Sequence, residues 1–141
     1  MKAIEIIFVF VLMCISIWSC KEGFNNPMAE ATIINESGGT IPTQTRLSNP
    51  YPNPLERSKN NYLGVTITIA VSHSKVVNLA IENLIGDVVC VLRNESTSAG
   101  MYVVMWNTKN NDRELVRAGF YIVHLTTSTG DSQKKLIEIR D

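Results

Sequence analysis

The sequence has no excess of either charge, because 13 basic residues balance 13 acidic ones over 141 residues. Proteins that bind nucleic acids usually carry a surplus of Lys and Arg on one face, so this balance argues against a nucleic-acid partner. With 45% hydrophobic residues, the chain also lacks the composition of a disordered protein. We therefore expect one folded domain and no nucleic acid among its partners.

Residues that carry catalysis or bind metals are scarce and scattered. The two histidines, His73 and His124, have no cysteine or histidine at metal-ligand spacing. The polar stretch from Asn107 to Arg113 lacks the alternating acids, central glycine and closing glutamate of a calcium loop. Phosphate-loop, dinucleotide and serine-hydrolase motifs are also missing from the sequence. We expect a protein that is not an enzyme, with no cofactor, no metal and no small-molecule substrate.

No apolar run is long enough to span a membrane as a helix. The longest, from Ile6 to Ile17, follows Lys2 and is shorter than the roughly 20 residues that a bilayer requires, so it indicates a signal peptide. It ends at Ile17-Trp18-Ser19-Cys20, which resembles the lipobox of bacterial lipoproteins. The resemblance implies removal of residues 1–19 and attachment of lipid, palmitate included, to Cys20. An ordinary secretory signal with an incidental Cys20, or an uncleaved anchor, is the alternative.

Residues 20–46 are rich in Asn, Gly, Ser, Thr and Pro, which is typical of a flexible linker. We expect a lipidated N-terminus and linker there, followed by a single domain over residues 47–141. Cysteine is rare, and the lipoprotein interpretation leaves only Cys90 as a free thiol. Because Cys90 lies between two valines, we expect it to be a small buried apolar residue.

The domain shows apolar residues at every second position and no helical periodicity, which predicts short half-buried strands. Asn83–Asp87, with Gly86, and Ser128–Asp131 are expected as tight turns, and polar Arg93–Ser98 as a separator between strands. Together these features predict an all-β, antiparallel, immunoglobulin-like β-sandwich of about seven strands. The expected strand segments are 65–71, 77–82, 88–92, 102–106, 121–125 and 135–140.

Five segments in order resemble the type A C-terminal sorting domain of the type IX secretion system, and the related immunoglobulin-like domain of flagellar hook-capping (FlgD-type) proteins. They are Ser48-Asn49-Pro50-Tyr51-Pro52-Asn53-Pro54, Asn83-Leu84-Ile85-Gly86-Asp87-Val88-Val89, Ala99-Gly100-Met101-Tyr102 with Trp106-Asn107, Arg117-Ala118-Gly119-Phe120-Tyr121, and Lys134-Lys135-Leu136-Ile137.

The matched residues also have plain structural roles. The prolines at 50, 52 and 54 suit an edge strand that enters the sandwich, and Gly119 suits a bend or a close backbone approach. We expect Trp106 and Tyr121 to fill the core, with their polar ends reaching backbone groups at the sandwich edge.

The resemblance implies that outer-membrane secretion machinery recognises the domain, and that a sortase-like enzyme removes it after export. Lys134 and Lys135 are then possible sorting-recognition residues on a charged surface. We expect the protein in the bacterial cell envelope, at the outer membrane or cell surface through its N-terminal lipid; a secreted or periplasmic protein is the alternative. Because only a linker separates Cys20 from the domain, a lipoprotein whose module is structural, or binds another envelope protein without any sorting role, is the second interpretation.

Overall fold

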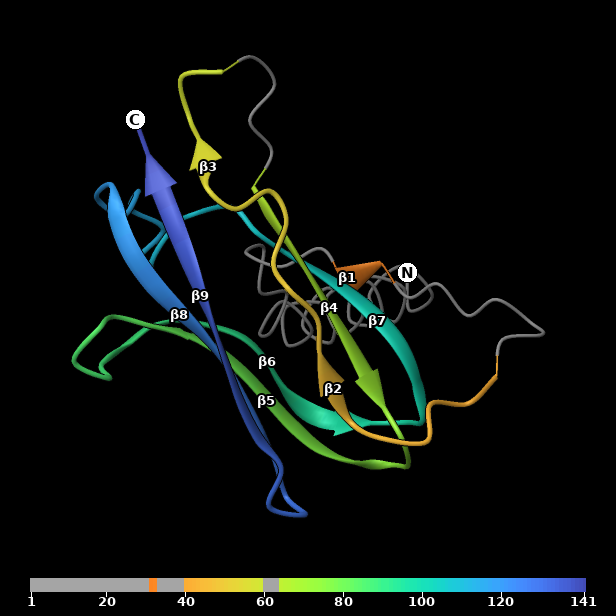
Figure 1. The fold of residues 1–141 in the computed structure, drawn as a ribbon. Helices are drawn as coiled ribbons and strands as arrows, with labels where there is room; N and C mark the ends of the chain where they lie inside the picture. The colour runs from red at the N-terminus through yellow and green to blue at the C-terminus, as the bar shows by residue number, and fades with distance from the viewer. Residues whose placement is uncertain (1–30, 33–39, 60–63) are drawn as a thin grey trace, which may run out of the picture.

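The computed structural model describes residues 31–32, 40–59 and 64–141 (Figure 1). The expected signal peptide, Cys20 and most of the expected linker lie outside these residues. The described part contains strands and no helix, and the strands form two sheets, which confirms the all-β sandwich. Six of the nine strands have seven or more residues, and the other three have two.

The smaller sheet has the strand order β1-β7-β4-β2 and the larger one the order β3-β9-β8-β5-β6 (Figure 1). The first sheet comprises β1 (Ala31–Thr32), β7 (Gly100–Trp106), β4 (Val65–Val71) and β2 (Arg46–Leu47). The second comprises β3 (Leu55–Glu56), β9 (Ser132–Arg140), β8 (Gly119–Thr127), β5 (Lys75–Glu82) and β6 (Val88–Thr97).

The core lies between the sheets and follows the predicted alternation. In β4 the buried residues alternate with partly exposed ones along the whole strand, because successive side chains of a strand point to opposite faces. The expected inward residues of β5, β7 and β8 are likewise buried or partly buried. The largest fully buried side chains are Trp106, Leu47, Ile67, Ile69, Leu79, Ile81, Leu125, Ile137 and Ile139.

The two aromatic residues expected in the core meet there. The rings of Trp106 and Tyr121 pack edge to face with their centroids 5.4 Å apart. Trp106 Nε1 donates to the carbonyl of Lys109 at 2.9 Å, and the Tyr121 hydroxyl donates to the carbonyl of Arg117 at 2.8 Å. Both polar ends therefore reach the backbone, as predicted.

Strand β6 corrects one expectation. We expected the strand to end at Leu92 and Arg93–Ser98 to separate it from the next, but β6 continues to Thr97 and pairs with β5 along its whole length. Arg93 and Thr97 are buried, Arg93 Nε donates to Thr97 Oγ1 at 3.0 Å, and the guanidinium lies 4.8 Å from the Tyr102 ring centroid. The strand accommodates these polar residues because they satisfy one another and contact an aromatic face.

The proline-rich segment crosses from one sheet to the other. Strand β2 pairs antiparallel with β4, Tyr51 bridges to Thr66, and β3 then pairs with the last strand, β9. We expected an antiparallel sandwich, but the β3–β9 pair is parallel.

The folded part also begins before residue 47. The Thr45 side chain is buried, β2 starts at Arg46, and Ala31–Thr32 pair with Val103 and Val104 of β7.

Candidate functional site

The closing strand β9 carries the two lysines that the sequence nominated, and it places them on opposite faces. Lys134 shares the outer face with Leu136 and Glu138, whereas Lys135 shares the inner side with Gln133 and buried Ile137. Because adjacent strand residues point to opposite faces, the two lysines do not form one charged surface.

Lys134 belongs to a polar cluster that joins three strands. Its Nζ donates to Oε2 of Glu82 at 2.9 Å, and the other carboxylate oxygen lies 2.6 Å from Nδ1 of His124. The second nitrogen of His124, Nε2, is 3.0 Å from the Ser132 hydroxyl. Burial raises the pKa of Glu82, but the hydrogen bonds to Lys134 and His124 outweigh it and hold the pKa below its ordinary value.

This cluster has the hydroxyl–imidazole–carboxylate order of a hydrolase triad, which sequence reasoning missed. Glu82 is 42 residues from His124 in the chain, and the cluster forms only because β5, β8 and β9 are neighbours in the sheet. Both oxygens of Glu82 and both ring nitrogens of His124 are engaged within the cluster. We interpret it as a polar ladder that ties the outer faces of three strands together.

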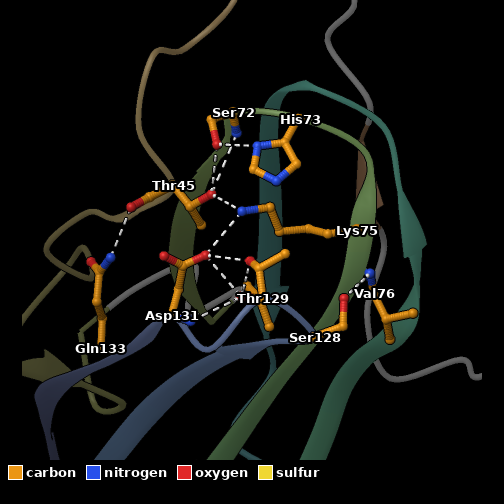
Figure 2. A network of polar contacts seen from close by, with 10 residues as sticks. Thr45, Ser72, His73, Lys75, Val76, Ser128, Thr129, Asp131 and Gln133 are labelled. Atoms are coloured by element: carbon orange, nitrogen blue, oxygen red, sulfur yellow. Dashed lines mark hydrogen bonds and ion pairs between the residues drawn. The ribbon is translucent and has the colours of Figure 1, made fainter.

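A second polar network closes one end of the sandwich (Figure 2). The Lys75 side chain is only 2% exposed, and its Nζ donates to Thr45 Oγ1 and to Asp131 Oδ2, each at 2.9 Å. The same Asp131 oxygen accepts hydrogen bonds from the hydroxyls of Thr127 and Thr129. Hydrogen bonds from Lys75 and from these two threonines lower the pKa of Asp131 to about 2.

The sequence contained one sign of this network, a lysine at a position where the strand pattern places apolar residues. Lys75 stands two residues before Val77, so the alternation of β5 already placed it on the inward face. A lysine buried there requires a carboxylate partner. The sequence could not show that this partner is Asp131, in the turn between β8 and β9.

Gln133 holds β2 against β9 beside this network (Figure 2). Its Nε2 donates to the carbonyl of Thr45 at 2.8 Å, and its Oε1 accepts from the backbone N–H of Leu47 at 2.9 Å. The amide of Gln133 therefore forms hydrogen bonds with the Thr45 carbonyl and the Leu47 N–H, which take the place of the backbone hydrogen bonds of a neighbouring strand.

Next to Gln133 lies a groove that we call the β2 groove. Its volume is about 520 Å³, and the segment around β2, together with β4, β7 and β9, provides its walls. Lys135, the second lysine nominated from the sequence, lies in it together with Arg46. The lining residues are Pro42, Thr43, Gln44, Arg46, Leu47, Ser48, Asn49, Ala70, Met101 and Lys135.

The remaining nominated residues are distributed as follows. Cys20 lies outside the described residues. Cys90 is buried, as predicted, and burial raises the pKa of its thiol. His73 contacts Ser72 at the edge of the second network, 3.1 Å from the hydroxyl.

The polar loop from Asn107 to Arg113 folds back on the free edge of β6. Asn111 Oδ1 accepts from the N–H of Val91, and its own N–H donates to the carbonyl of Val89. The loop thus covers part of an edge that could otherwise pair with another chain.

Across 31–32, 40–59 and 64–141, no group of three or more His, Cys, Asp or Glu side chains is arranged to hold a metal ion. No helix of sufficient length and hydrophobicity to cross a membrane occurs in the same part of the chain.

No protein family matches the chain, and no curated protein matches it. Among solved structures, the chain is similar to one from a study of PorZ, described as an essential bacterial surface component of the type IX secretion system of Porphyromonas gingivalis. The identity is 21% and the TM-score 0.45, over 69% of this chain and 11% of that chain. This chain thus matches only a small part of that protein, and at this TM-score the likeness says nothing about function.

Proposed function

We propose that this chain is a non-enzymatic, exported bacterial protein, anchored in the membrane through lipid on Cys20, whose residues 47–141 act as a C-terminal sorting-type β-sandwich. One observation carries the proposal: the five segments that resemble the type A sorting domain follow one another along a two-sheet sandwich, four of them at a crossing, a hairpin or the start of a strand and the fifth within the closing strand.

Each of these segments has a definite place in the fold. Residues 48–54 make the crossing between the sheets, and Gly86, with a φ of +96°, closes the β5–β6 hairpin. Gly100 and Gly119 begin β7 and β8, each with a positive φ that other residues rarely adopt. The lysine pair lies within β9. A sequence that shares these residues in this order needs the same crossing, the same hairpin turn and the same strand starts as the sorting domains.

The outer face of β9 offers a surface that secretion machinery can contact. Leu136 of β9 and Phe120 of the neighbouring strand β8 are both about half exposed on this side of the sheet, where the Lys134–Glu82 ion pair also lies. Large apolar side chains exposed next to charges are typical of protein-binding surfaces.

The decisive experiment fuses the domain to the C-terminus of a fluorescent passenger that carries a signal peptide, in a host with a type IX system. The fusion should begin at residue 40, because a cut at residue 47 removes Thr45 and its bonds to Lys75 and Gln133. We expect surface delivery of the passenger, followed by removal of the domain.

Charge variants replace a truncation of β9 as controls, since removing residues 134–141 would deprive β8 and β3 of their partner strand. Lys134→Gln tests the outer face and Lys135→Glu tests the β2 groove, one at a time. Retention of the unmodified fusion in the periplasm with its domain uncut would exclude sorting. The second interpretation, a lipoprotein with a structural or protein-binding module, would then stand.

A further inference from the structure

The β2 groove brings together two positive charges that lie far apart in the sequence. Arg46 comes from β2 and Lys135 from β9, and both line the groove. The ten described lining residues include no aspartate or glutamate. In a chain whose formal charge is zero, this is a local surplus of positive charge.

Neither cation has a partner among the residues that the structure describes. No ion pair or side-chain hydrogen bond joins Arg46 or Lys135 to any residue of 40–59 or 64–141, although six other Lys and Arg residues there pair with acids outside this groove. Those pairs are Arg57–Asp141, Lys59–Glu56, Lys75–Asp131, Arg93–Glu95, Lys134–Glu82 and Arg140–Glu138. The groove cations thus remain available to an anion from outside.

The rest of the lining suits a polypeptide better than a nucleic acid. Gln44 and Asn49 supply amides, Thr43 and Ser48 supply hydroxyls, and Ala70 and Met101 supply apolar surface. Amides and hydroxyls can both donate to and accept from a peptide backbone. None of the ten lining residues is aromatic, so the groove lacks the stacking surface on which single-stranded nucleic acids are usually held.

The wall of the groove is fixed before any ligand binds. Gln133 ties the backbone of Thr45 and Leu47 to β9, and the hydroxyl of Thr45 is also bonded to Lys75. A preformed wall lowers the entropic cost of binding, because the protein has little left to order.

We propose that the β2 groove binds an extended acidic segment of a protein partner, with Arg46 and Lys135 pairing with its carboxylates. Arg46 can hold a carboxylate through two parallel hydrogen bonds, and Lys135 provides a second point charge across the groove. This site is separate from the Lys134 face of β9 and does not require that the domain be a sorting signal.

The test uses the full-length chain, purified in detergent micelles, and a fluorescent peptide that contains six glutamates. Anisotropy titrations compare the unmodified chain with Arg46→Glu and with Lys135→Glu. The matched control is Arg117→Glu, which makes the same charge change at an exposed residue just before β8, outside the groove. A peptide with glutamine in place of glutamate serves as the uncharged ligand.

We expect each groove variant to raise the Kd of the glutamate peptide about tenfold or more, and Arg117→Glu to leave it within about twofold. Affinity should fall with added salt, and the glutamine peptide should bind weakly to every variant. Unchanged thermal unfolding of the groove variants would assign the loss to the groove, because neither side chain has a described partner to lose.

Three results would overturn the proposal. Equal losses in Arg117→Glu and the groove variants would show a general charge effect and no site. Tight binding of polyphosphate or of an anionic polysaccharide, with no binding of the glutamate peptide, would show that the ligand is not a polypeptide. Absence of measurable peptide binding to the unmodified chain at low salt would exclude the site. Failure of the sorting fusion, by contrast, would not contradict peptide binding in the β2 groove.

Discussion

Trp106 has the largest fully buried side chain among the described residues. Its side chain is fully buried, packs against Tyr121, and donates its indole N–H to the Lys109 carbonyl. Replacing the Trp106 side chain with a smaller one therefore removes apolar contacts and also leaves the Lys109 carbonyl without its donor.

We expect Trp106→Ala to lower the free energy of unfolding by about 3 to 5 kcal/mol, a large share of the total for a domain of this size. Urea unfolding followed by circular dichroism measures the change. Trp106→Phe, which keeps most of the ring, should lose clearly less. A cost below about 1 kcal/mol for the alanine variant would contradict the burial of the indole.

Cys90 allows a second test at the residue scale. Burial in the core raises the pKa of its thiol, which reduces the fraction of reactive thiolate at neutral pH and shields the sulfur from reagents. In a Cys14→Ser, Cys20→Ser background, Cys90 is the sole cysteine.

We expect no labelling of Cys90 by a thiol reagent at pH 7 until denaturant unfolds the chain, and one equivalent afterwards. Rapid labelling in the folded state would show that β6 opens locally. Mass spectrometry of the labelled protein distinguishes these outcomes.

At the scale of elements, the ion pair between Lys75 and Asp131 joins β5 to the β8–β9 turn. The folded pKa of Asp131 is about 2, below its ordinary value of 3.8. The folded state therefore favours the ionised carboxylate. The stability that this preference contributes is fully present above about pH 4 and is lost as the pH falls from about 4 to about 2.

We expect the pH dependence of unfolding in that window to flatten in Asp131→Asn. At pH 7 this variant should lose about 1 to 3 kcal/mol, because it leaves the buried Lys75 ammonium without its carboxylate. Lys75→Met removes the buried charge as well and should cost less than Asp131→Asn. The opposite order would contradict this account of the network. Urea titrations at several pH values provide the measurement.

The sequence revealed the regular parts of the strands because burial on one face leaves a repeating pattern. The inward faces of β4, β5, β7 and β8 followed directly from alternation. Alternation does not reveal polar residues that are buried with distant partners. Arg93, bonded to Thr97 and stacked on Tyr102, looked like part of a loop for that reason.

The candidate sites were less predictable than the strands. Lys134 and Lys135 are adjacent in the sequence, yet one is paired with Glu82 and the other lies in the β2 groove with Arg46. That division depends on which strands neighbour β9, and pairing between strands distant in sequence is a property of the fold. The register of β3 parallel to β9 was unpredictable for the same reason.

At the scale of the whole molecule, anchoring through Cys20 remains a prediction. In a bacterium grown with labelled palmitate, we expect label in the protein, and none in Cys20→Ser. The domain of this variant should keep its stability, since Cys20 lies outside the described sandwich. An unlabelled, fully soluble wild-type protein would contradict the lipoprotein interpretation.

The parallel pairing of β3 with β9 has a mechanical consequence. Leu55–Glu56 and Ile139–Arg140 run in the same direction, and Asn53 reinforces the junction through bonds to Leu136 and Glu138. Forces that pull the two ends of the domain apart would slide these strands along one another, so several hydrogen bonds would bear the load together instead of breaking singly. A domain built in this way resists stretching, which would be a useful property in the lipid-anchored protein proposed above.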